Sequence, residues 1–443
     1  MHPIPDPVPS DATLPSRVDA VVIGGGIAGV AAAYFLAKKG HSVALLEKGQ
    51  IAGEQSSRNW GWCRTQNRDQ RELPLQLLSM ELWETLSRET AEDLGFRRNG
   101  LIYVTKSESE LATWSNWIDM ARQYQVRNTV LSPAAAKRLT PGNEQDWIGG
   151  IHAPTDGRAE PTMAAPRLAR AARALGVSVH QNCAVRGVDV VGGKVAGVVT
   201  ERGRIAADVV LCAAGAWSSM LLRRHGIDLP QAGIRSTVFA TTPGPEVTPG
   251  GLVTPDFTLS RRLDGSYIVA AQNRGRLEVT PQGVRYARQF WPTFKERRKS
   301  LRMGVGRSFV TGPEAIARKW SFDAPTPFER HRVYAPPADR GVAGPALAKV
   351  IASYPALSGI GIGGLWAGWI DVTPDSIPVI SAIDQLPGLF LATGFSGHGF
   401  GIGPGAGRLA ADIVAGDTPS VDPHAFRYAR LVDGSVLGKP GMM

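Results

Sequence analysis

Three glycines and one glutamate near the start of the chain have the types and spacing of a dinucleotide-binding site. Gly24, Gly26 and Gly29 form the pattern GxGxxG, and Glu47 follows 23 residues after Gly24. The first two glycines let the backbone turn and let a pyrophosphate approach, while the third lets a helix pack closely on a strand. An acidic residue at this distance can accept a hydrogen bond from a ribose hydroxyl. The pattern therefore predicts dinucleotide binding.

The segments around the glycines have the order of elements that such a site needs. Residues 19–24 are a short apolar run with β-branched side chains, residues 28–40 have helical periodicity and end at a glycine, and residues 41–47 are a second apolar run. The positive N-terminal end of the helix stabilises phosphate charge. A chance glycine-rich turn would not supply all these parts in order. We expect a Rossmann-like unit in which Ile27 and Ala28 contact the ligand.

Two further segments can complete the site. Small polar side chains after the second strand can reach a pyrophosphate and the far end of the cofactor. Residues 177–215 predict short strands joined by turns at Gly192-Gly193 and Gly203, which favours a three-stranded excursion that closes over an adenine. The contacts expected from these segments are Lys48, Ser56, Ser57, Arg58, Asn59, Trp60, Gly61, Val185, Ala214, Gly215 and Trp217.

The bulk composition limits the possible classes of protein. The length of 443 residues suggests two domains or one interleaved unit, and 43% hydrophobic with 20% charged residues is typical of a globular chain. The net charge of +10 suits nucleic acid, acidic lipid or anionic substrates, but no nucleic-acid-binding motif accompanies it. Three widely spaced cysteines without a CxxC pattern favour a reducing compartment and no metal site.

The first seventeen residues and the hydropathy bear on localisation. Residues 1–17 are rich in proline and contain no apolar run, so we expect a flexible tail and not a signal peptide. No run of 18 apolar residues, the length that predicts a membrane span, occurs anywhere in the sequence. We expect a cytoplasmic or membrane-peripheral protein.

Five blocks of the sequence, in this order, resemble the D-amino-acid oxidase/sarcosine oxidase superfamily of flavoproteins. They are "VVIGGGIAGVAAAYFLAKKGHSVALLEK", "DGRAEPTMAAPRLARAARALG", "ADVVLCAAGAWS", "VTPDSIPVI" and "LPGLFLATGFSGHGFGIGPGAGRLAADIV". The resemblance extends from about Asp19 to Ala425. Within the superfamily the chain looks most like the bacterial L-amino acid deaminases, because "IAGEQSSR" and the block from "ARQFWPTF" to "PFERHRVYAPPAD" match theirs.

The resemblance implies noncovalent FAD and oxidation of a C–N bond next to a hydrogen-bearing carbon. Hydride would pass from the carbon bearing nitrogen to flavin N5, and the imine would hydrolyse to a carbonyl and ammonia or an amine. The substrate would be an amino acid or amine, and the electron acceptor oxygen, quinone or a dye. An alternative is a membrane-peripheral dehydrogenase that passes electrons to quinone. A tRNA-modifying flavoprotein would need an added basic module, and none is visible.

The glycine-rich stretch near the C-terminus then predicts the flavin contact. From Gly397 to Gly407 every second residue is glycine, and we expect this backbone to lie against the isoalloxazine ring. A helix over residues 405–416 would point its N-terminus at the ring and stabilise negative charge there. His398 resembles the family's "SGHG" histidine, which either shapes the ring's environment or holds the loop, and is not the general base. Predicted flavin contacts are Gly368, Gly397, His398, Gly399, Phe400 and Gly401.

Substrate orientation is expected from an arginine and aromatic side chains. Arg64 lies where the resemblance places a carboxylate-binding arginine, although it could equally bind pyrophosphate or lie on the surface. Three features depart from the family pattern. Where this chain has Gly401 and Gly368, sarcosine oxidases have a lysine and a flavin-linked cysteine. The strand "LWAGWIDV" also lacks the carboxylate-binding arginine of amino-acid oxidases. In sarcosine oxidases a lysine near the flavin often primes the reaction with oxygen, and near its expected place this chain has Gln272 and Asn273. The candidate catalytic residues are therefore Arg64, His398 and Gln272. Tryptophans expected at the ring are Trp60, Trp62, Trp366 and Trp369.

The chain is predicted to be α/β plus α+β, with a Rossmann-like FAD-binding domain interleaved with a substrate domain built on a mostly antiparallel sheet. A basic, aromatic-bearing helical segment over residues 285–330 could touch a membrane or cap the active site, and both readings stay open. The expected domains are 18–72, 151–230 and 346–443 for FAD, and 73–150 and 231–345 for substrate.

Overall fold

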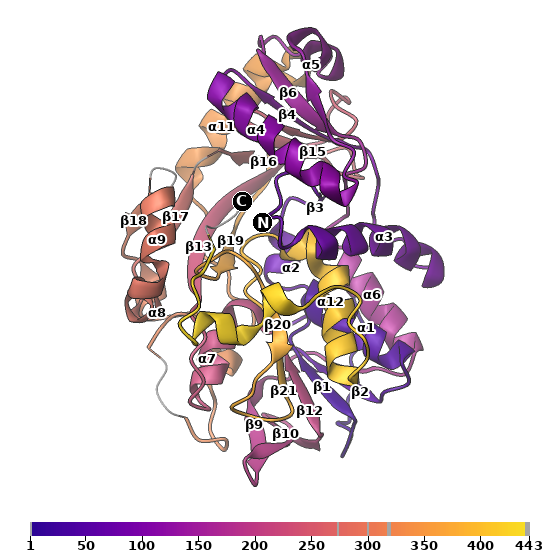
Figure 1. Cartoon of the computed structure of the whole chain (residues 1–443), viewed down its shortest axis with the longest axis vertical. Coiled ribbons are helices and arrows are strands. Elements are labelled where there is room, and N and C mark those ends of the chain that lie inside the picture. Colours follow the sequence, from indigo (N-terminus) through magenta and orange to yellow (C-terminus); the bar gives the residue numbers. More distant parts are fainter. Residues whose placement is uncertain (1, 273, 299–300, 317–319, 439–443) are drawn as a thin grey trace.

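Two sheets organise the molecule in the computed structural model, which describes residues 2–272, 274–298, 301–316 and 320–438. A parallel sheet with helices packed on it makes up the lower part of the view in Figure 1, and a larger sheet rises above it. The chain passes between the two parts several times, as the interleaved fold class predicts. Within the described residues, no helix is long and apolar enough to cross a membrane.

The first sheet has six strands in the order β20-β21-β12-β1-β2-β8. Five of them are parallel, and β20 is antiparallel to β21. All four residues of β1 and of β2 are buried and apolar, because helices cover one face of this sheet and the three-stranded sheet of residues 185–206, with residues 217–222, covers the other. The bounds are β1 (Ala20–Ile23), β2 (Val43–Leu46), β8 (Ser178–His180), β12 (Val209–Cys212), β20 (Val379–Ala382) and β21 (Leu389–Thr393).

Three helices pack against this sheet and against one another: α1 (Ile27–Lys38), α6 (Ala164–Ala174) and α12 (Gly399–Ala415). Alanine-rich α1 is buried over most of its length. Helix α12 begins six residues earlier than predicted, with Pro404 in its first turns. A Cβ at Gly407 would lie 2.4 Å from the Cβ of Ala31, and one at Gly405 would lie 2.7 Å from the Leu75 carbonyl oxygen.

These distances correct one expectation. The later glycines of the run, Gly403, Gly405 and Gly407, serve the packing of α12 on its neighbouring helices. They do not bring backbone to a flavin ring. The glycines up to Gly401 line the cavity, and those from Gly403 on allow close helix packing. The alternating pattern in the sequence does not distinguish these two roles.

A three-stranded antiparallel sheet follows α6 in the chain, as predicted for residues 177–215. Gly192 and Gly193, with φ of 59° and 76°, form the turn between its first two strands. Glycine adopts this left-handed conformation without steric cost. The strands are β9 (Val185–Val191), β10 (Lys194–Thr200) and β11 (Gly203–Ala206).

The larger sheet has the order β18-β17-β13-β16-β15-β14-β4-β6-β5, and β19 pairs with β13 beside this path. Its pairs are antiparallel except β14–β4 and β17–β18, so the predicted substrate-side sheet is confirmed. Its strands are β4 (Leu101–Thr105), β5 (Thr129–Leu131), β6 (Gly149–Ala153), β13 (Ala232–Thr241), β14 (Gly251–Val253), β15 (Phe257–Arg261), β16 (Tyr267–Ala271), β17 (Gly275–Glu278), β18 (Leu301–Gly304) and β19 (Ile362–Val372).

The other elements connect the two sheets or cover them. The helices are α2 (Gln55–Arg58), α3 (Leu73–Glu89), α4 (Glu108–Ala121), α5 (Pro133–Leu139), α7 (Ser218–Arg223), α8 (Pro281–Arg285), α9 (Ala287–Arg297), α10 (Pro327–Arg330) and α11 (Arg340–Ser353). A two-stranded sheet pairs β3 (Trp62–Cys63) with β7 (Gly157–Arg158). Short 3-10 helices are η1 (Arg122–Tyr124), η2 (Gly215–Trp217), η3 (Arg307–Phe309), η4 (Pro355–Leu357), η5 (His424–Phe426) and η6 (Tyr428–Leu431).

The N-terminal segment differs from the expected flexible tail. Residues 2–17 form no helix and no strand, but Asp6 pairs with Arg167 at 2.8 Å and Asp11 with Arg173 at 2.7 Å. The backbone N–H of Asp11 also donates to the Val179 carbonyl. These contacts attach the segment to α6 and β8. The predicted division into domains stays a prediction. Strand β19, which belongs to the predicted FAD-domain residues 346–443, lies in the larger sheet.

Candidate active site

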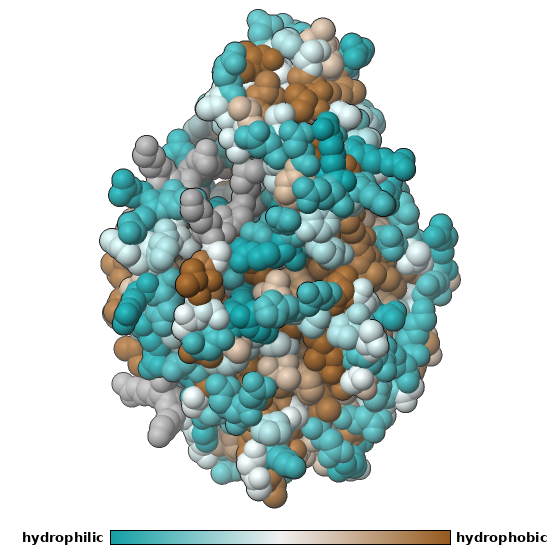
Figure 2. All heavy atoms as spheres, viewed as in Figure 1, coloured by the Kyte–Doolittle hydropathy of each residue, from teal (hydrophilic) through white to brown (hydrophobic). Residues whose placement is uncertain are grey.

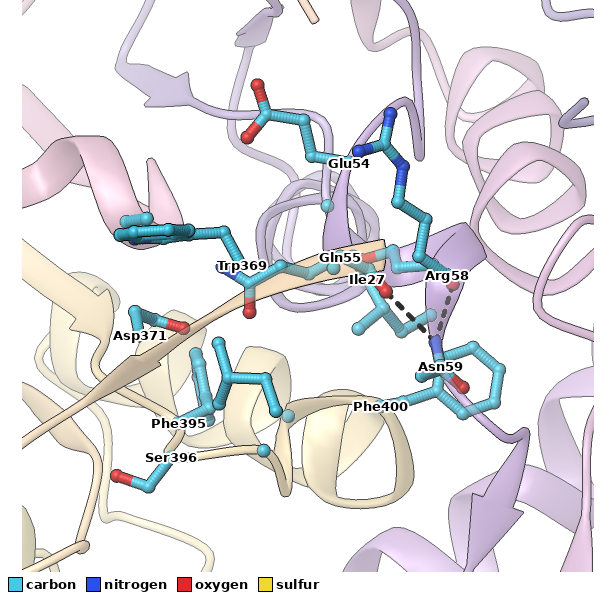
Figure 3. A pocket seen from close by; sticks show the side chains of 18 of the residues that line it. Ile27, Glu54, Gln55, Arg58, Asn59, Trp369, Asp371, Phe395, Ser396 and Phe400 are labelled. Atoms are coloured by element: carbon cyan, nitrogen blue, oxygen red, sulfur yellow. Dashed lines mark hydrogen bonds between the residues drawn. The ribbon is translucent and has the colours of Figure 1, made fainter. Parts of the chain in front are cut away.

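A cavity of about 460 Å³ lies where the carboxyl ends of β1, β2 and β12 face β13 and β19 of the larger sheet (Figure 3). Ligands of open parallel sheets bind beyond the carboxyl ends of the strands. Most predicted site residues line it: Gly24, Gly26, Ile27, Ala28, Glu47, Lys48, Ser56, Arg58, Asn59, Trp60, Trp62, Arg64, Val185, Ala214, Gly215, Trp217, Gln272, Gly368, Trp369, Gly397, His398, Gly399, Phe400 and Gly401.

Four predicted residues lie outside the lining. Gly29 supports the site by close packing, because a Cβ there would lie 2.1 Å from the Gly24 carbonyl oxygen. The Ser57 hydroxyl donates to the Glu54 carbonyl, 3.3 Å away. A Cβ at Gly61 would lie 2.4 Å from the Ala159 carbonyl oxygen. Trp366 packs with apolar residues of β13 and β16 and donates from Nε1 to the Arg58 carbonyl at 3.1 Å.

The GxGxxG turn has the shape that its sequence predicts. Gly24 has φ of +113°, and a Cβ on it would lie 2.4 Å from the Ala213 carbonyl oxygen, so only glycine fits. Gly26 precedes the first turn of α1, and the Ile27 N–H donates to the Ser56 hydroxyl at 2.9 Å. The first N–H groups of a helix have no acceptor within the helix. This end of the cavity therefore favours an anion.

Glu47 closes the nucleotide end. Its carboxylate accepts hydrogen bonds from the Gly25 N–H at 2.7 Å and the Gly49 N–H at 2.8 Å. Burial raises the pKa of Glu47, and the charge of Lys48 and the two N–H groups oppose that shift. The two donors fix the carboxyl group at the rim of the cavity. The predicted bond to a ribose hydroxyl stays a prediction.

Residues 327–334, here called the strap, cross the nucleotide end from the middle of the chain. The Lys48 ammonium donates to the His331 and Arg332 carbonyls at 2.7 and 2.9 Å and pairs with Glu54 at 2.6 Å. It also lies 4.5 Å from the centre of the Trp217 ring. The protein thus already uses the positive charge of Lys48, which weakens the prediction that this side chain holds the cofactor directly.

Arg58 has unused hydrogen-bond donors. The side chain is buried, and its Nη1 donates to the Tyr334 carbonyl of the strap at 2.7 Å. Its Nε and Nη2 are buried and have no hydrogen-bond acceptor among the residues that the structure describes. Burial lowers the pKa of Arg58, and the charge of Glu54 opposes the shift. A buried guanidinium with two unused donors at a cavity wall is suited to a bound anion.

At the opposite end, the start of α12 faces the cavity. The Gly401 carbonyl accepts hydrogen bonds from the Ser79 hydroxyl at 2.8 Å and Trp83 Nε1 at 2.9 Å. A Cβ at Gly401 would lie 2.8 Å from the Trp62 carbonyl oxygen. Backbone of β3 therefore occupies the space that a side chain would need. This packing explains why the lysine of sarcosine oxidases cannot stand at this position.

His398 forms a buried pair with Glu72, a residue that the sequence analysis missed. His398 Nδ1 lies 3.2 Å from Oε2 of Glu72. Burial, followed by the charges of Arg68 and Arg64, lowers the pKa of His398 well below its usual value. Burial raises the pKa of Glu72 to about 8. Both groups are therefore mainly neutral at pH 7, so His398 is suited to holding the loop and shaping its surroundings.

Two arginines occupy the end of the cavity beside His398. Arg64, the predicted carboxylate ligand, donates from Nη1 to the Gln66 carbonyl. Arg68, which the sequence analysis did not single out, donates from Nε to the Arg64 carbonyl at 3.3 Å. Among the ion pairs of the described residues, none involves either arginine. Only the spacing of four residues in "RTQNR" hinted at the second one.

Aromatic side chains line the cavity between its two ends. Trp60 and Trp62 meet edge to face with ring centres 4.8 Å apart. Trp369 meets Tyr334 edge to face at 5.7 Å and occupies space above Gly233, where a Cβ would lie 2.0 Å from the indole nitrogen. Gln272 lines the cavity as expected, and Asn273 lies outside the described residues. The predicted aromatic wall is present without Trp366.

A further buried acid, Asp371, was also missed. It accepts hydrogen bonds from the Gly394 N–H at 3.0 Å and from Gln231 Nε2 at 3.1 Å. Burial raises the pKa of Asp371 to about 6. In Figure 3 it lies on the same strand as Trp369, below the indole. The alternation of "WIDV" in β19 was a signal that could have placed it next to the pocket.

Comparison with known proteins decides the family. The sequence pattern of the family described as "FAD dependent oxidoreductase" matches residues 19–413. The chain belongs to this family. Its members use FAD, so the predicted cofactor is confirmed, as is the predicted superfamily.

Relatives and solved structures agree with this assignment. Human mitochondrial sarcosine dehydrogenase is 28% identical over 94% of this chain and 42% of its own length. Sarcosine oxidase subunit beta of Arthrobacter is 26% identical over 96% of this chain and 93% of its own length. L-amino acid deaminase of Proteus myxofaciens, solved with anthranilate, superposes with a TM-score of 0.90 at 28% identity and covers 95% of both chains. The chain spans less than half the length of the first curated relatives it matches.

The residues around the cavity fit FAD. The glycine turn leaves backbone open at Gly24 and Gly26, and Arg58 offers two buried donors without an acceptor. Glu47 lies beyond the turn, and the backbone from Gly397 to Gly401 borders the far end. The pyrophosphate would take the donors near α1, and the ring would lie toward α12. Gly368 carries no sulfur, so this position offers no covalent link to the flavin.

Proposed function

We propose that this chain oxidises a C–N bond of an amino acid or of an amine that bears a carboxylate, and releases a carbonyl compound with ammonia or an amine. The observation that carries the proposal is Arg64, a buried guanidinium that forms no salt bridge with any described residue and lies at the end of a cavity that fits FAD. Arginine binds carboxylate in a two-pronged geometry. Support also comes from relatives whose names specify sarcosine, 4-methylaminobutanoate and D-amino acids.

Bound FAD would supply the chemistry by accepting hydride from the carbon that bears nitrogen. The protein's part is to bind, orient and keep the substrate amine neutral. Arg64 would hold the carboxylate, and Trp60 and Trp62 would exclude water around the reacting carbon. The positive charges of Arg64 and Arg68 disfavour an ammonium ion nearby and so lower the substrate's amine pKa. No side chain is required to remove a proton from carbon.

Anaerobic flavin reduction tests the proposal. The purified protein, loaded with FAD, is mixed with amino acids of both hands, N-alkyl amino acids and amines, and the flavin absorbance is followed. Bleaching by any amine class is the expected result, and admitting air then shows by its rate whether oxygen is the acceptor. A panel that leaves the flavin oxidised throughout would overturn the proposal.

The basic middle segment favours a second candidate, a membrane-peripheral dehydrogenase with quinone as acceptor. Apolar side chains are exposed here, with 55% of Trp291, 72% of Val310 and 68% of Ile316 accessible. Arginines and lysines surround them, as amphipathic membrane-binding segments require. At the edge where Figure 1 places α8 and α9, Figure 2 shows apolar atoms among hydrophilic ones. The other exposed apolar residues are Val284, Met303, Val305 and Phe309.

Cosedimentation with vesicles separates this candidate from a soluble cap over the active site. Binding to vesicles containing anionic lipid, weaker in high salt, together with reduction of a soluble quinone, is the expected result for the peripheral enzyme. The variant Trp291→Ser should weaken binding to the vesicles. Trp114→Ser is unsuitable as a control, because the Trp114 side chain is buried. Val190→Ser, on the distant three-stranded sheet, is the matched exposed control. If the protein sediments equally with and without vesicles, the peripheral candidate is excluded and the segment acts as a cap over the active site.

A further inference from the structure

The end of the cavity beside His398 holds more positive charge than one carboxylate requires. Arg64 and Arg68 line this end, and their exposed fractions are only 7% and 3%. Neither guanidinium has a salt bridge among the described residues. Burying two like charges without a counter-charge is costly. We therefore expect each of the two guanidinium groups to bind an anionic group of a ligand.

The neighbouring acids offset the charge of this pair only in part. The charge of Asp156 opposes the fall in the pKa of Arg68, but Asp156 forms no ion pair with either guanidinium among the described residues. Asp156 uses both carboxyl oxygens on the adjoining turn, where it accepts from Thr65 N and Thr65 Oγ1 at 2.8 and 2.7 Å and from Gln66 N at 3.1 Å. Glu72, whose pKa burial raises to about 8, is mainly uncharged at pH 7. Burial and the charge of Arg64 lower the pKa of Arg68 to about 9, so Arg68 remains a cation at pH 7.

Arg68 also has donors to spare. Within the described part of the chain, Arg68 donates one hydrogen bond, from Nε to the Arg64 carbonyl, and its buried Nη1 has no acceptor. The guanidinium therefore lies at the cavity wall with unused N–H groups beside the group that would hold a carboxylate. Unused buried donors of a charged group point to a ligand that supplies the acceptor.

The turn that carries both arginines is rigid. Asn67 has a left-handed backbone, with φ of 57°, which returns the chain so that Arg68 reaches the Arg64 carbonyl. Gln66 Nε2 donates to Asn67 Oδ1 at 3.0 Å, and Asn128 donates to Gln66. All three amide side chains are buried. Because both guanidinium groups are already positioned, little conformational entropy is lost when an anion binds.

Resting on the proposed function, we propose that the substrate carries two acidic groups, one bound by Arg64 and the second by Arg68. The substrate class is an amino dicarboxylate or an amine bearing two carboxylates. A simple monocarboxylate bound by Arg64 would leave the buried Nη1 of Arg68 without an acceptor among the described residues.

Matched substrate pairs test this inference on the FAD-loaded enzyme. The pairs are glutamate with glutamine and aspartate with asparagine, both hands of each, and iminodiacetate with sarcosine. For at least one pair, the diacid should reduce the flavin ~10- to 100-fold more efficiently than its partner, the range expected for a charge-assisted hydrogen bond. Arg68→Met should remove that preference, because it lowers reduction by the diacid ~10- to 100-fold more than reduction by its partner. Arg68→Lys should keep part of it.

A binding measurement gives a readout that does not depend on turnover. Glutarate should bind the oxidised enzyme ~10- to 100-fold more tightly than pentanoate by calorimetry, and Arg68→Met should abolish the difference. Arg122→Met, at an exposed arginine paired with Asp119, is the matched control and should change nothing. The melting temperature and the flavin spectrum show whether each variant folds and holds FAD.

The outcomes separate the two proposals. If the monoacids reduce the flavin as efficiently as the diacids, or Arg68→Met lowers both equally, the two-anion inference is overturned and the proposed function stands. If no compound of either kind reduces the flavin, the proposed function fails. Glutarate binding then still decides whether Arg68 forms a second anion site.

Discussion

Replacing Arg58 by methionine should change cofactor affinity and apoprotein stability in opposite directions. Arg58 is 4% exposed, and two of its three guanidinium nitrogens have no acceptor in the described structure. In the apoprotein this buried charge is a cost, and substitution of a buried charge by an apolar side chain of similar size is neutral or stabilising by about 1–4 kcal/mol. Loss of the single bond to Tyr334 subtracts about 1 kcal/mol from that gain.

With FAD bound, the balance reverses. One or two charge-assisted hydrogen bonds to phosphate contribute about 1.5–3 kcal/mol each, so Arg58→Met should weaken FAD binding ~10-fold to 150-fold for one lost bond. Apoprotein is titrated with FAD by flavin fluorescence, and the melting temperature is measured with and without FAD. Lys48→Met is the comparison, because Lys48 already donates to protein carbonyls. An unchanged FAD affinity in Arg58→Met refutes the assignment of this side chain to the cofactor.

Three further changes have definite expected results. Arg64→Met should raise KM for a carboxylate substrate ~10- to 150-fold with little loss of FAD, measured by steady-state kinetics and flavin absorbance. Gly401→Ala, whose Cβ would meet β3 backbone at 2.8 Å, should lower the unfolding free energy by about 1–3 kcal/mol in denaturant melts, whereas Gly344→Ala, with open space around it, should not. Because folding raises the pKa of Glu72 to about 8, the folded state loses stability as pH rises from about 5 to 8. Glu72→Gln should flatten that part of the stability profile, and Glu81→Gln, at an exposed position of the helix that Glu72 precedes, is the control.

Local sequence signals placed the nucleotide half of the cavity well. The glycine turn, α1 and β2 lie within thirty residues, and each follows from local rules of backbone freedom and periodicity. The three-stranded excursion was equally predictable, because Gly192 and Gly193 mark its turn. Their partners are close in sequence, so no long-range contact had to be guessed.

The substrate half depended on contacts that the sequence does not display. Glu72 and His398 meet across 326 positions of sequence, and burial, not residue type, sets their protonation. The start of α12 was placed too late because Pro404 and alternate glycines disfavour helix in isolation, whereas packing on α1 and α3 requires them. Arg68 was passed over because an arginine in a polar loop is ordinarily exposed.

The strap joins two parts of the molecule that the sequence predicted to be separate. It comes from the middle segment, yet Lys48, Glu54 and Arg58 of the nucleotide end all bond to its backbone. The same segment begins at α9, where Arg297 lines the substrate end of the cavity. Residues between these points carry the exposed apolar side chains. The described residues of the middle segment therefore contact both the nucleotide end and the substrate end of the cavity.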